Sequence, residues 1–338
     1  MTVSLSDLRL YLYRHRGYIP SFIGDIFKVF WWRITRQKIV VITTGSGGVG
    51  DYLWIRNYYP IIRQKRYKII LIAMSHWQEI VESFDKDHVD IIRYFESCIS
   101  PKRIESFFFS LFNVDVFLNF RKTCIADVVR CSIEYNDIDI PEKQFYEEKN
   151  NATFSRFLPL PANFKHTLPI IEPKNKINNY VLLVESGNTQ GRLSDTQLTS
   201  IICHLVSKQY HILLNGNYKQ TATLFSPETR EYLIDGKAFT FPEYTWLIAN
   251  AVFVVTVNTA LYHFALQLDR PCVVISCNEY HSLKLNQPKE IYVFNEELEK
   301  HYYNNTLVDY QSIEDVRITD ISADRIIAAI DKISTKLK

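Results

Sequence analysis

Short apolar runs and longer amphipathic segments alternate along most of this chain. Runs of five to seven residues rich in Val, Ile and Leu are typical of strands that are buried on both faces of a sheet. They occur at 38–44, 68–74, 89–94, 114–120, 180–186, 210–216, 252–257, 272–276 and 290–294. Helix-length segments separate successive runs, and this alternation predicts parallel, doubly wound sheets.

A proline-rich stretch divides the alternating pattern into two halves. Residues 158–179 contain four prolines and show little periodicity. Because 338 residues are too many for one ordinary domain, we predict an α/β fold of two Rossmann-like domains. Their expected bounds are 39–160 and 180–318, with a linker at 161–179. The last segment, 319–338, has helical spacing, with Ser322 or Asp320 as its expected cap.

Residues 1–38 differ in character from the rest of the chain. They carry seven Lys and Arg against two Asp, and aromatic and aliphatic side chains lie between the charges. Basic residues interleaved with aromatic ones suit an amphipathic helix at the surface of an anionic membrane. The alternative is a pair of helices that packs its aromatic face on the following domain.

Composition excludes several classes of protein. Hydrophobic residues at 47 % and charged residues at 22 % describe a globular chain, and a net charge of +2 argues against a dedicated nucleic-acid binder. The six cysteines show no CxxC pair or zinc spacing and are expected to be buried, reduced thiols of a cytosolic protein. No apolar stretch reaches membrane-span length, and a secretory signal is not expected.

The most informative segment is VVTVNTALYHFALQLDRP at 254–271, a strand followed by the start of a helix. Backbone N–H groups at the start of a helix lack helical partners and favour an anion. The N–H groups near 258–261 and the ring of His263 are therefore expected to face a phosphate. On residue type alone, a core histidine is the more ordinary interpretation of His263.

A second candidate phosphate loop, TTGSGGVGD at 43–51, follows the first strand. Its glycines also fit the GxGxxG pattern, but no acidic residue follows the second strand where a dinucleotide site needs one, which disfavours a dehydrogenase. Asp51 lies at the mouth of this loop, where parallel sheets bind ligands. There it is suited to accept a proton from an attacking hydroxyl, although Asp also favours helix caps.

Four segments, taken in order, resemble the heptosyltransferase-like family of GT-B glycosyltransferases. They are GVGDYLWIRNYYP at 48–60, NTQGRLSDTQL at 188–198, ILLNGN at 212–217 and VNTALYHFALQLDRP at 257–271. The resemblance covers about residues 38–300. It implies two Rossmann-like domains with a cleft between them. It also implies inverting transfer, without a metal or other cofactor, of a sugar from a nucleotide-diphosphate donor to a bacterial surface glycan such as lipopolysaccharide core.

The resemblance implies roles for individual residues. Asp51 becomes the general base, Arg192 and His263 contact the donor phosphates, and a helix start and a strand end hold the rest of the nucleotide. The implied donor residues are Gly50, Arg192, Asn215, Gly216, Asn258, Thr259, Ala260, Leu261 and His263. Residues of a possible acceptor or secondary site are Gly47, Gly48, Glu185, Asn188 and Glu243. Glu185 is the reserve carboxylate, and Glu243 is interpreted as a ribose contact or a helix-start residue.

The sequence departs from the family pattern at several positions: the proline after Asp51 comes about two residues late, Arg192 stands where Lys is common, and two residues of the helix start differ. Asn258 stands where the family usually has aspartate, and Ala260 where it has glycine, so the donor is left as a heptose or another hexose-like sugar. The alternatives are a non-catalytic nucleotide-sugar binder and a GT-B-like transferase that moves a pyruvyl group. A lipid-linked acceptor and a location on the inner face of the bacterial inner membrane are expected.

Metal-dependent glycosyl transfer is the remaining class considered. Asp85-Lys86-Asp87 and Asp137-Ile138-Asp139 both fit the Asp-x-Asp metal motif. Both lie outside the expected site and are interpreted as solvated turns. The histidines show no spacing typical of metal ligands.

Overall fold

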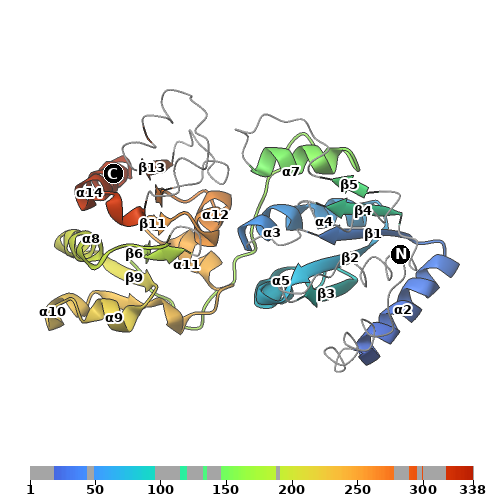
Figure 1. Cartoon of the computed structure of the whole chain (residues 1–338), viewed down its shortest axis with the longest axis horizontal. Helices are drawn as coiled ribbons and strands as arrows, with labels where there is room; N and C mark the ends of the chain where they lie inside the picture. The colour runs from blue at the N-terminus through green and yellow to red at the C-terminus, as the bar shows by residue number, and fades with distance from the viewer. Residues whose placement is uncertain are drawn as a thin grey trace. The chain divides into compact units, whose positions relative to one another are not determined.

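The computed structural model describes residues 19–43, 49–95, 115–119, 132–134, 146–187, 191–277, 289–294, 299 and 317–337. The chain divides into two compact units, residues 1–165 and 166–338. Each unit contains one parallel sheet with helices around it (Figure 1). The boundary between the units falls within the proline-rich stretch.

The first unit contains a five-stranded parallel sheet in the order β3-β2-β1-β4-β5. Its strands are β1 (Lys38–Thr43), β2 (Tyr67–Met74), β3 (Ile91–Phe95), β4 (Val116–Asn119) and β5 (Ser132–Glu134). Its helices are α2 (Ile19–Ile34), α3 (Val49–Ile55), η1 (Arg56–Tyr58), α4 (Tyr59–Gln64), η2 (Ser75–Trp77), α5 (Gln78–Asp85) and α7 (Tyr146–Ser155).

Both faces of this sheet are covered. On one face, Val29 and Trp32 of α2 pack against alternate residues of β1, β2 and β3. The intervening residues Val40 and Ile42 of β1 are also buried, on the other face. Burial on both faces explains why these strands are continuous apolar runs rather than alternating ones.

The second unit contains a six-stranded parallel sheet in the order β10-β9-β6-β11-β12-β13, and a small antiparallel hairpin, β7-β8. The strands of the large sheet are β6 (Tyr180–Val184), β9 (His211–Asn215), β10 (Leu233–Asp235), β11 (Val254–Val257), β12 (Cys272–Ser276) and β13 (Glu290–Phe294). The hairpin consists of β7 (Ser186–Gly187) and β8 (Gly191–Arg192).

Two layers of helices enclose the second sheet (Figure 1). Helices α8 and α14 share one hydrophobic core with alternate residues of the strands, and α11 and α12 lie on the opposite side. The helices are α8 (Asp195–Ser207), α9 (Tyr218–Ala222), α10 (Pro227–Arg230), η5 (Gly236–Ala238), α11 (Tyr244–Asn250), α12 (Ala260–Gln267), η7 (Ile318–Asp320) and α14 (Ala323–Lys336). Ser194 and Gln197 form a capping box at the start of α8.

The predicted fold class is confirmed, since all nine predicted runs contain a strand and both large sheets are parallel. Two three-residue strands, β5 and β10, and the β7-β8 hairpin were not predicted from the sequence. One detail of the cysteine prediction is wrong: Cys272 and Cys277 are buried, but Cys203 is exposed on α8. Cys98, Cys124 and Cys131 lie outside the described residues.

Two general properties concern only the part of the chain that the structure describes. Among its helices, none combines the length and the apolar character that a membrane crossing needs. Its His, Cys, Asp and Glu side chains form no group of three that is arranged to hold a metal ion. Asp137 and Asp139 lie outside the described residues.

Candidate functional site

The strand order of the second sheet places a candidate site at one edge. From β6 the chain proceeds outward to β9 and β10, whereas β11, adjacent to β6 on its other side, leads to β12 and β13. The strand order therefore reverses between β6 and β11. Open parallel sheets bind ligands at such a switch point, beyond the carboxyl ends of the two strands. The segments that follow Val184 and Val257 are thus the first to consider.

Helix α12 begins directly after β11 at this switch point. Thr259 is its N-cap, and Oγ1 of Thr259 accepts a hydrogen bond from the backbone N–H of Leu261 at 3.3 Å. Asn258 is 5 % exposed, and its N–H donates to the carbonyl of Ile275 at 3.0 Å. Fewer N–H groups are therefore available for a ligand than the sequence predicts. Those of Thr259 and Ala260 have no hydrogen-bond partner among the residues that the structure describes.

His263 is the fourth residue of α12, and its side chain is only 6 % exposed. Burial lowers the pKa of His263 to about 4, because an apolar environment disfavours the charged ring. The imidazole is neutral at pH 7. The ring of His263 therefore adds no positive charge to this edge of the sheet.

The β7-β8 hairpin lies directly against the start of α12. A Cβ atom at Gly187 would lie 2.5 Å from Cγ2 of Thr259 and 3.3 Å from Cγ2 of Val257. Only glycine allows this approach. The contact places the β7 end of the hairpin, whose other strand carries Arg192, against the helix start.

Glu185 follows β6 and is 1 % exposed. Its Oε1 accepts from Nε of Arg192 at 3.1 Å and from the N–H of Asn217 at 2.6 Å, and its Oε2 accepts from Oγ1 of Thr221 at 2.9 Å. Both oxygens are therefore occupied in this arrangement. We interpret Glu185 as the anchor of Arg192 and of the loop after β9 rather than as a reserve base.

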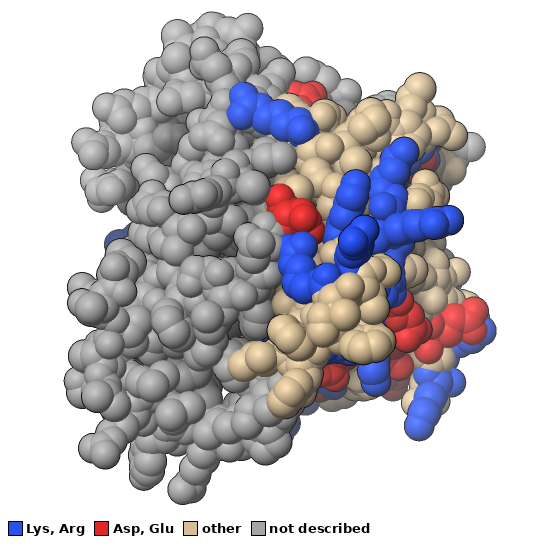
Figure 2. All heavy atoms as spheres, turned by 90° about the vertical axis from the view of Figure 1, so that its right-hand side faces the viewer, with Lys and Arg blue, Asp and Glu red and all other residues tan. Residues whose placement is uncertain are grey.

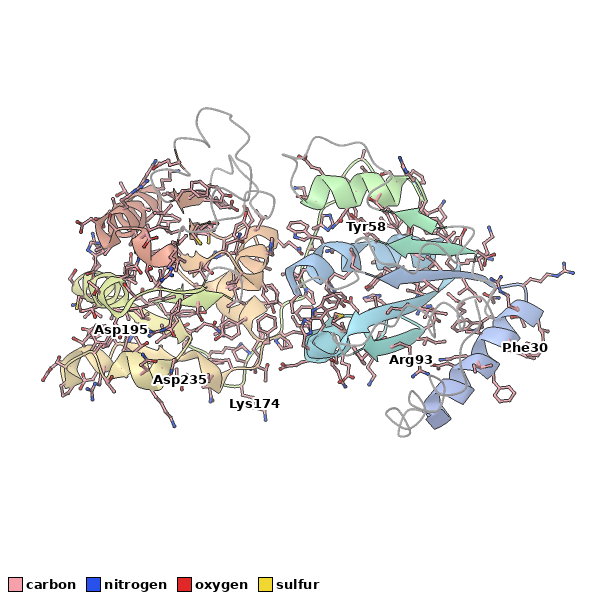
Figure 3. All side chains as sticks on the ribbon, in the orientation of Figure 1. Phe30, Tyr58, Arg93, Lys174, Asp195 and Asp235 are labelled. Carbon is pink, nitrogen blue, oxygen red and sulfur yellow. The ribbon has the colours of Figure 1, made fainter. Side chains whose placement is uncertain are left out.

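Arg192 is held by three groups but remains 29 % exposed. Besides Glu185, it donates from Nη1 to Asp195 at 2.9 Å and from Nη2 to Thr221 at 3.2 Å; Asp195 lies at the start of α8 (Figure 3). Burial lowers the pKa of Arg192, but hydrogen bonds to Asp195 and Glu185 outweigh it and raise the pKa overall. Three of the five guanidinium N–H groups are used within the described residues, so two remain for a ligand.

Asn215 and Gly216, at the end of β9, complete this edge of the sheet. Nδ2 of Asn215 donates to Oη of Tyr244 at 2.8 Å, and burial raises the pKa of Tyr244 to about 12. A Cβ atom at Gly216 would overlap the carboxylate side chain of Glu185. Glycine at 216 is therefore required by the position of Glu185, a reason that the sequence analysis did not identify.

Glu243 precedes α11 and has a local partner. Its Oε2 accepts from the N–H of Thr240 at 2.7 Å and from Oγ1 of Thr240 at 2.9 Å. These bonds stabilise the turn before the helix; Glu243 is the N-cap of α11 by position, but its side chain makes no capping hydrogen bond to the helix. A ribose contact through Glu243 is not tested.

Asp51 lies in the first turn of α3, which is the helix that follows β1 in the first unit. The first sheet reverses its strand order between β1 and β4, so α3 begins at that sheet's own switch point. Gly50 belongs to the same turn. Gly47, Gly48, Asn188 and the side chain of Asp51 lie outside the described part of the structure. The position of Asp51 on the fold suits the role proposed for it, and the role itself stays a prediction.

The residue after Asp51 belongs to a buried polar cluster. Asp85 at the end of α5 is 1 % exposed and binds Arg56 through two hydrogen bonds, from Nε at 3.0 Å and Nη2 at 2.9 Å. The hydroxyl of Tyr52 also donates to Asp85. Burial raises the pKa of Asp85 and Arg56 opposes the rise; burial also raises the pKa of Tyr52, which stays a donor. The prediction of a solvated Asp85 is therefore wrong.

Comparisons with known proteins can now be set beside this geometry. No family model matches the sequence, and no curated protein matches it. The structure of E. coli ADP-heptose LPS heptosyltransferase II is similar, with a TM-score of 0.61 and 15 % identity, over 88 % of this chain and 99 % of that one. A glycosyl transferase family 9 structure from Veillonella parvula has a TM-score of 0.60 and 12 % identity, over 88 % of this chain and 97 % of that one.

A third similar structure contains a donor analogue. E. coli heptosyltransferase WaaC with ADP-2-deoxy-2-fluoro heptose has a TM-score of 0.58 and 13 % identity, over 87 % of this chain and 99 % of that one. Likeness at these identities concerns the fold, and activity has to be argued from the site. The chain has the α/β fold, with two parallel-sheet units, of glycosyltransferases of the heptosyltransferase type.

Proposed function

We propose that the protein is a glycosyltransferase that transfers a sugar from a nucleoside-diphosphate donor to a hydroxyl of a glycan. One observation carries the proposal: Gly187 packs the Arg192 hairpin against Thr259, so an arginine and a helix start lie at one switch point. The shared fold supports it, because structures with this fold include heptosyltransferases with ADP and with an ADP-heptose analogue.

The donor diphosphate would bind at this edge of the second sheet. The N–H groups of Thr259 and Ala260, the two remaining N–H groups of Arg192 and the neutral ring of His263 are its proposed partners. Together they offer hydrogen-bond donors and one positive charge to the leaving group without a metal ion. Asn215 and Gly216 would lie near the nucleoside.

Asp51 is the proposed general base. The acceptor oxygen would attack the anomeric carbon as the bond from that carbon to the diphosphate oxygen breaks, and the hydroxyl proton would pass to the carboxylate of Asp51. Attack opposite the leaving group inverts the anomeric configuration. A bacterial surface glycan on a lipid, such as lipopolysaccharide core, is the proposed acceptor, and the donor sugar is a heptose or another hexose-like sugar.

The first test is a thermal-shift screen of the full chain against ADP, UDP, GDP and CMP and their sugar conjugates. A ligand at 100 times its dissociation constant adds about 2.7 kcal/mol to the free energy of unfolding. One nucleotide is expected to raise the melting temperature more than the others. No shift with any diphosphate would contradict the site.

The second test separates binding from catalysis. Asp51→Asn is expected to lower kcat by about 10²- to 10⁴-fold and to leave the nucleotide-induced thermal shift intact. Asp87→Asn, at an exposed position of the same unit, is the matched control and should retain activity. Near-normal turnover of Asp51→Asn would refute the base assignment.

A non-catalytic nucleotide-sugar binder is the second candidate. It is favoured by the pairing of Arg192 with two carboxylates, Glu185 and Asp195, which offsets the positive charge expected of a transfer site. This candidate predicts a thermal shift with nucleotide-sugars but neither transfer nor donor hydrolysis in the wild-type chain.

A further inference from the structure

Helix α2 is apolar on two opposite faces. Its inner face packs Val29 and Trp32, 2 % and 6 % exposed, against the first sheet. Its outer face carries four large apolar side chains that are exposed by 57 % to 69 %, here named the outer stripe: Phe27, Phe30, Trp31 and Ile34. The stripe follows the i, i+3, i+4, i+7 spacing of one helix face, which surface helices normally keep polar. Figure 3 places Phe30 on the outward side of α2.

Two basic residues flank the outer stripe, and one of them, Arg33, is paired with Asp115. At about 100° per residue, Lys28 and Arg33 lie on the two borders of the stripe; they contact the carbonyl of Asp90 and the carboxylate of Asp115. Asp25, the one acidic residue of α2, forms an ion pair with Arg93 of β3. The negative charge of Asp25 is thus neutralised by Arg93 on the side of α2 that faces the sheet, away from the outer stripe.

A second basic group lies next to the end of α2, here named the basic rim. Lys38 begins β1 and is in register with Tyr67 at the start of β2, so the residues before these two strands share one edge of the sheet. The rim is exposed and consists of Arg36, Lys38, Lys65 and Arg66. Among the described residues, none of the four forms an ion pair. Figure 2 shows Lys and Arg gathered on this side of the first unit.

We propose that the outer stripe and the basic rim form a docking surface for a lipid bilayer with anionic headgroups. Phe and Trp side chains insert at the boundary between headgroups and acyl chains, and Lys and Arg attract anionic lipid. The two features lie next to each other, as such a surface requires. Docking does not depend on sugar transfer, so it is tested separately from the proposed activity.

A second copy of the chain fits this surface less well. A stable protein interface takes about 20–30 residues from each side, whereas the outer stripe offers four apolar side chains. A symmetric dimer would also bring the same patch of both copies together, so that two basic rims belong to one interface. Charge complementarity therefore favours an anionic lipid surface.

The chain's tryptophans give a direct probe of docking. All five are described, and Trp31 is 63 % exposed while the other four are at most 8 % exposed. The full chain is mixed with phosphatidylcholine vesicles prepared with and without phosphatidylglycerol, and tryptophan emission and acrylamide quenching are recorded. With phosphatidylglycerol, we expect a blue shift and protection from quenching. Both effects should weaken as salt is raised from about 0.1 M to 1 M.

Matched variants identify the surface by vesicle co-sedimentation. The stripe variant Phe27→Ser/Phe30→Ser and the rim variant Lys38→Glu/Lys65→Glu should each lower the partition coefficient about tenfold or more. Arg36 and Arg66 are left unchanged because their φ angles are positive. The controls make the same changes at exposed sites of the second unit, as Ile170→Ser/Leu224→Ser and Lys174→Glu/Lys237→Glu, and should alter partition less than about twofold.

Three outcomes would overturn the proposal. The first is wild-type partition that the stripe and rim variants leave unchanged. The second is weak acrylamide quenching of Trp31 without vesicles, which would show that protein already covers the stripe. The third is a concentration-dependent dimer that the stripe variant abolishes, in the absence of vesicle binding. Thermal unfolding of each variant confirms that it is folded.

Discussion

Each unit of the protein contains a nearly buried carboxylate bound to an arginine, and the two pairs differ in how much water reaches the arginine. In the first unit, Asp85 and Arg56 are 1 % and 8 % exposed. In the second, Glu185 is equally buried, but Arg192 is 29 % exposed. We name Asp85–Arg56 the sealed pair, because both groups are buried, and Glu185–Arg192 the open pair, because its arginine is partly exposed.

The contrast shows how exposure divides the roles of similar side chains. Taking both members of the Asp85–Arg56 pair out of water makes either one costly to lose, so the sealed pair specifies the core of the first unit. The open pair lies at the switch point and retains two N–H groups toward solvent. A ligand can bind there without disrupting the core. The following predictions test this distinction.

The largest effect on stability is expected in the sealed pair. Arg56→Leu leaves the Asp85 carboxylate buried without its counter-charge and should lower the free energy of unfolding by about 3–5 kcal/mol. Urea unfolding of the full chain, followed at probes in each unit, measures the change. Lys65→Leu removes an exposed basic side chain at an ordinary backbone conformation and should change it by less than about 0.5 kcal/mol. A loss below about 1 kcal/mol for Arg56→Leu would contradict a sealed, essential pair.

A pH-dependent effect of similar size is expected in the second unit. The pKa of His263 is about 4 in the folded protein and about 6.5 when unfolded, so the unfolded state binds the extra proton between these values. Stability should therefore fall as pH decreases from about 6.5 to 4, by up to about 3 kcal/mol from this residue.

The contribution of His263 to the pH dependence of stability is obtained by comparing wild type with a variant that lacks the imidazole. Carboxylates also titrate near pH 4, so wild type and His263→Gln are compared by urea unfolding at each pH. The difference between them should shrink as pH falls. A constant difference from pH 7 to pH 4 would show that His263 is not a buried neutral ring.

A smaller loss of stability is expected at Gly216, where the backbone lies against the Glu185 side chain of the open pair. Gly216→Ala would place a methyl group into the Glu185 side chain, and the forced shift should cost about 1–3 kcal/mol. Gly24→Ala is the matched control, because a Cβ atom at Gly24 would meet nothing within 4 Å; alanine in a helix interior is expected to be neutral or slightly stabilising. Equal melting temperatures of the two variants would show that the Glu185 side chain does not lie against the backbone at Gly216.

The smallest effect on stability is expected at the open arginine itself. Arg192→Ala should cost about 1 kcal/mol, since Asn217 and Thr221 still hold Glu185. Its main effect should be a loss of about 10- to 100-fold in nucleotide affinity, measured by calorimetry. If stability falls as far as in Arg56→Leu while affinity is kept, the open pair is a structural pair like the sealed one.

Much of the fold could be predicted because buried parallel strands leave a clear signal. The runs at 38–44 and 180–186 are apolar because both faces of each strand are covered. Strand β10, by contrast, has only three residues, of which Leu233 alone is buried. Three residues give no period to detect. The β7-β8 hairpin is equally short, and its position is determined by the contact of Gly187 with Thr259, which no local pattern shows.

The candidate site was predicted less completely. The order of motifs placed Arg192 and Thr259 in one region, and the strand order agrees with this. The partners of Arg192 were missed, because Glu185 and Thr221 meet it only through tertiary structure. The charge pattern was also misleading at Asp85, since a carboxylate followed directly by Lys86 and Asp87 gives no sign that Arg56 binds it in the core.

The hydrogen bond from Tyr52 to Asp85 has a consequence for its neighbour in α3. A buried, hydrogen-bonded side chain opposes rotation of its helix about the helix axis. Tyr52 is such a residue, since it is buried in the core of the first unit and bonded to Asp85. The rotation of α3 about its own axis is therefore fixed at the turn that contains position 51. Substitutions at position 51 are therefore expected to leave the rotation of α3 unchanged, so differences in activity among them will report the chemistry of the group introduced.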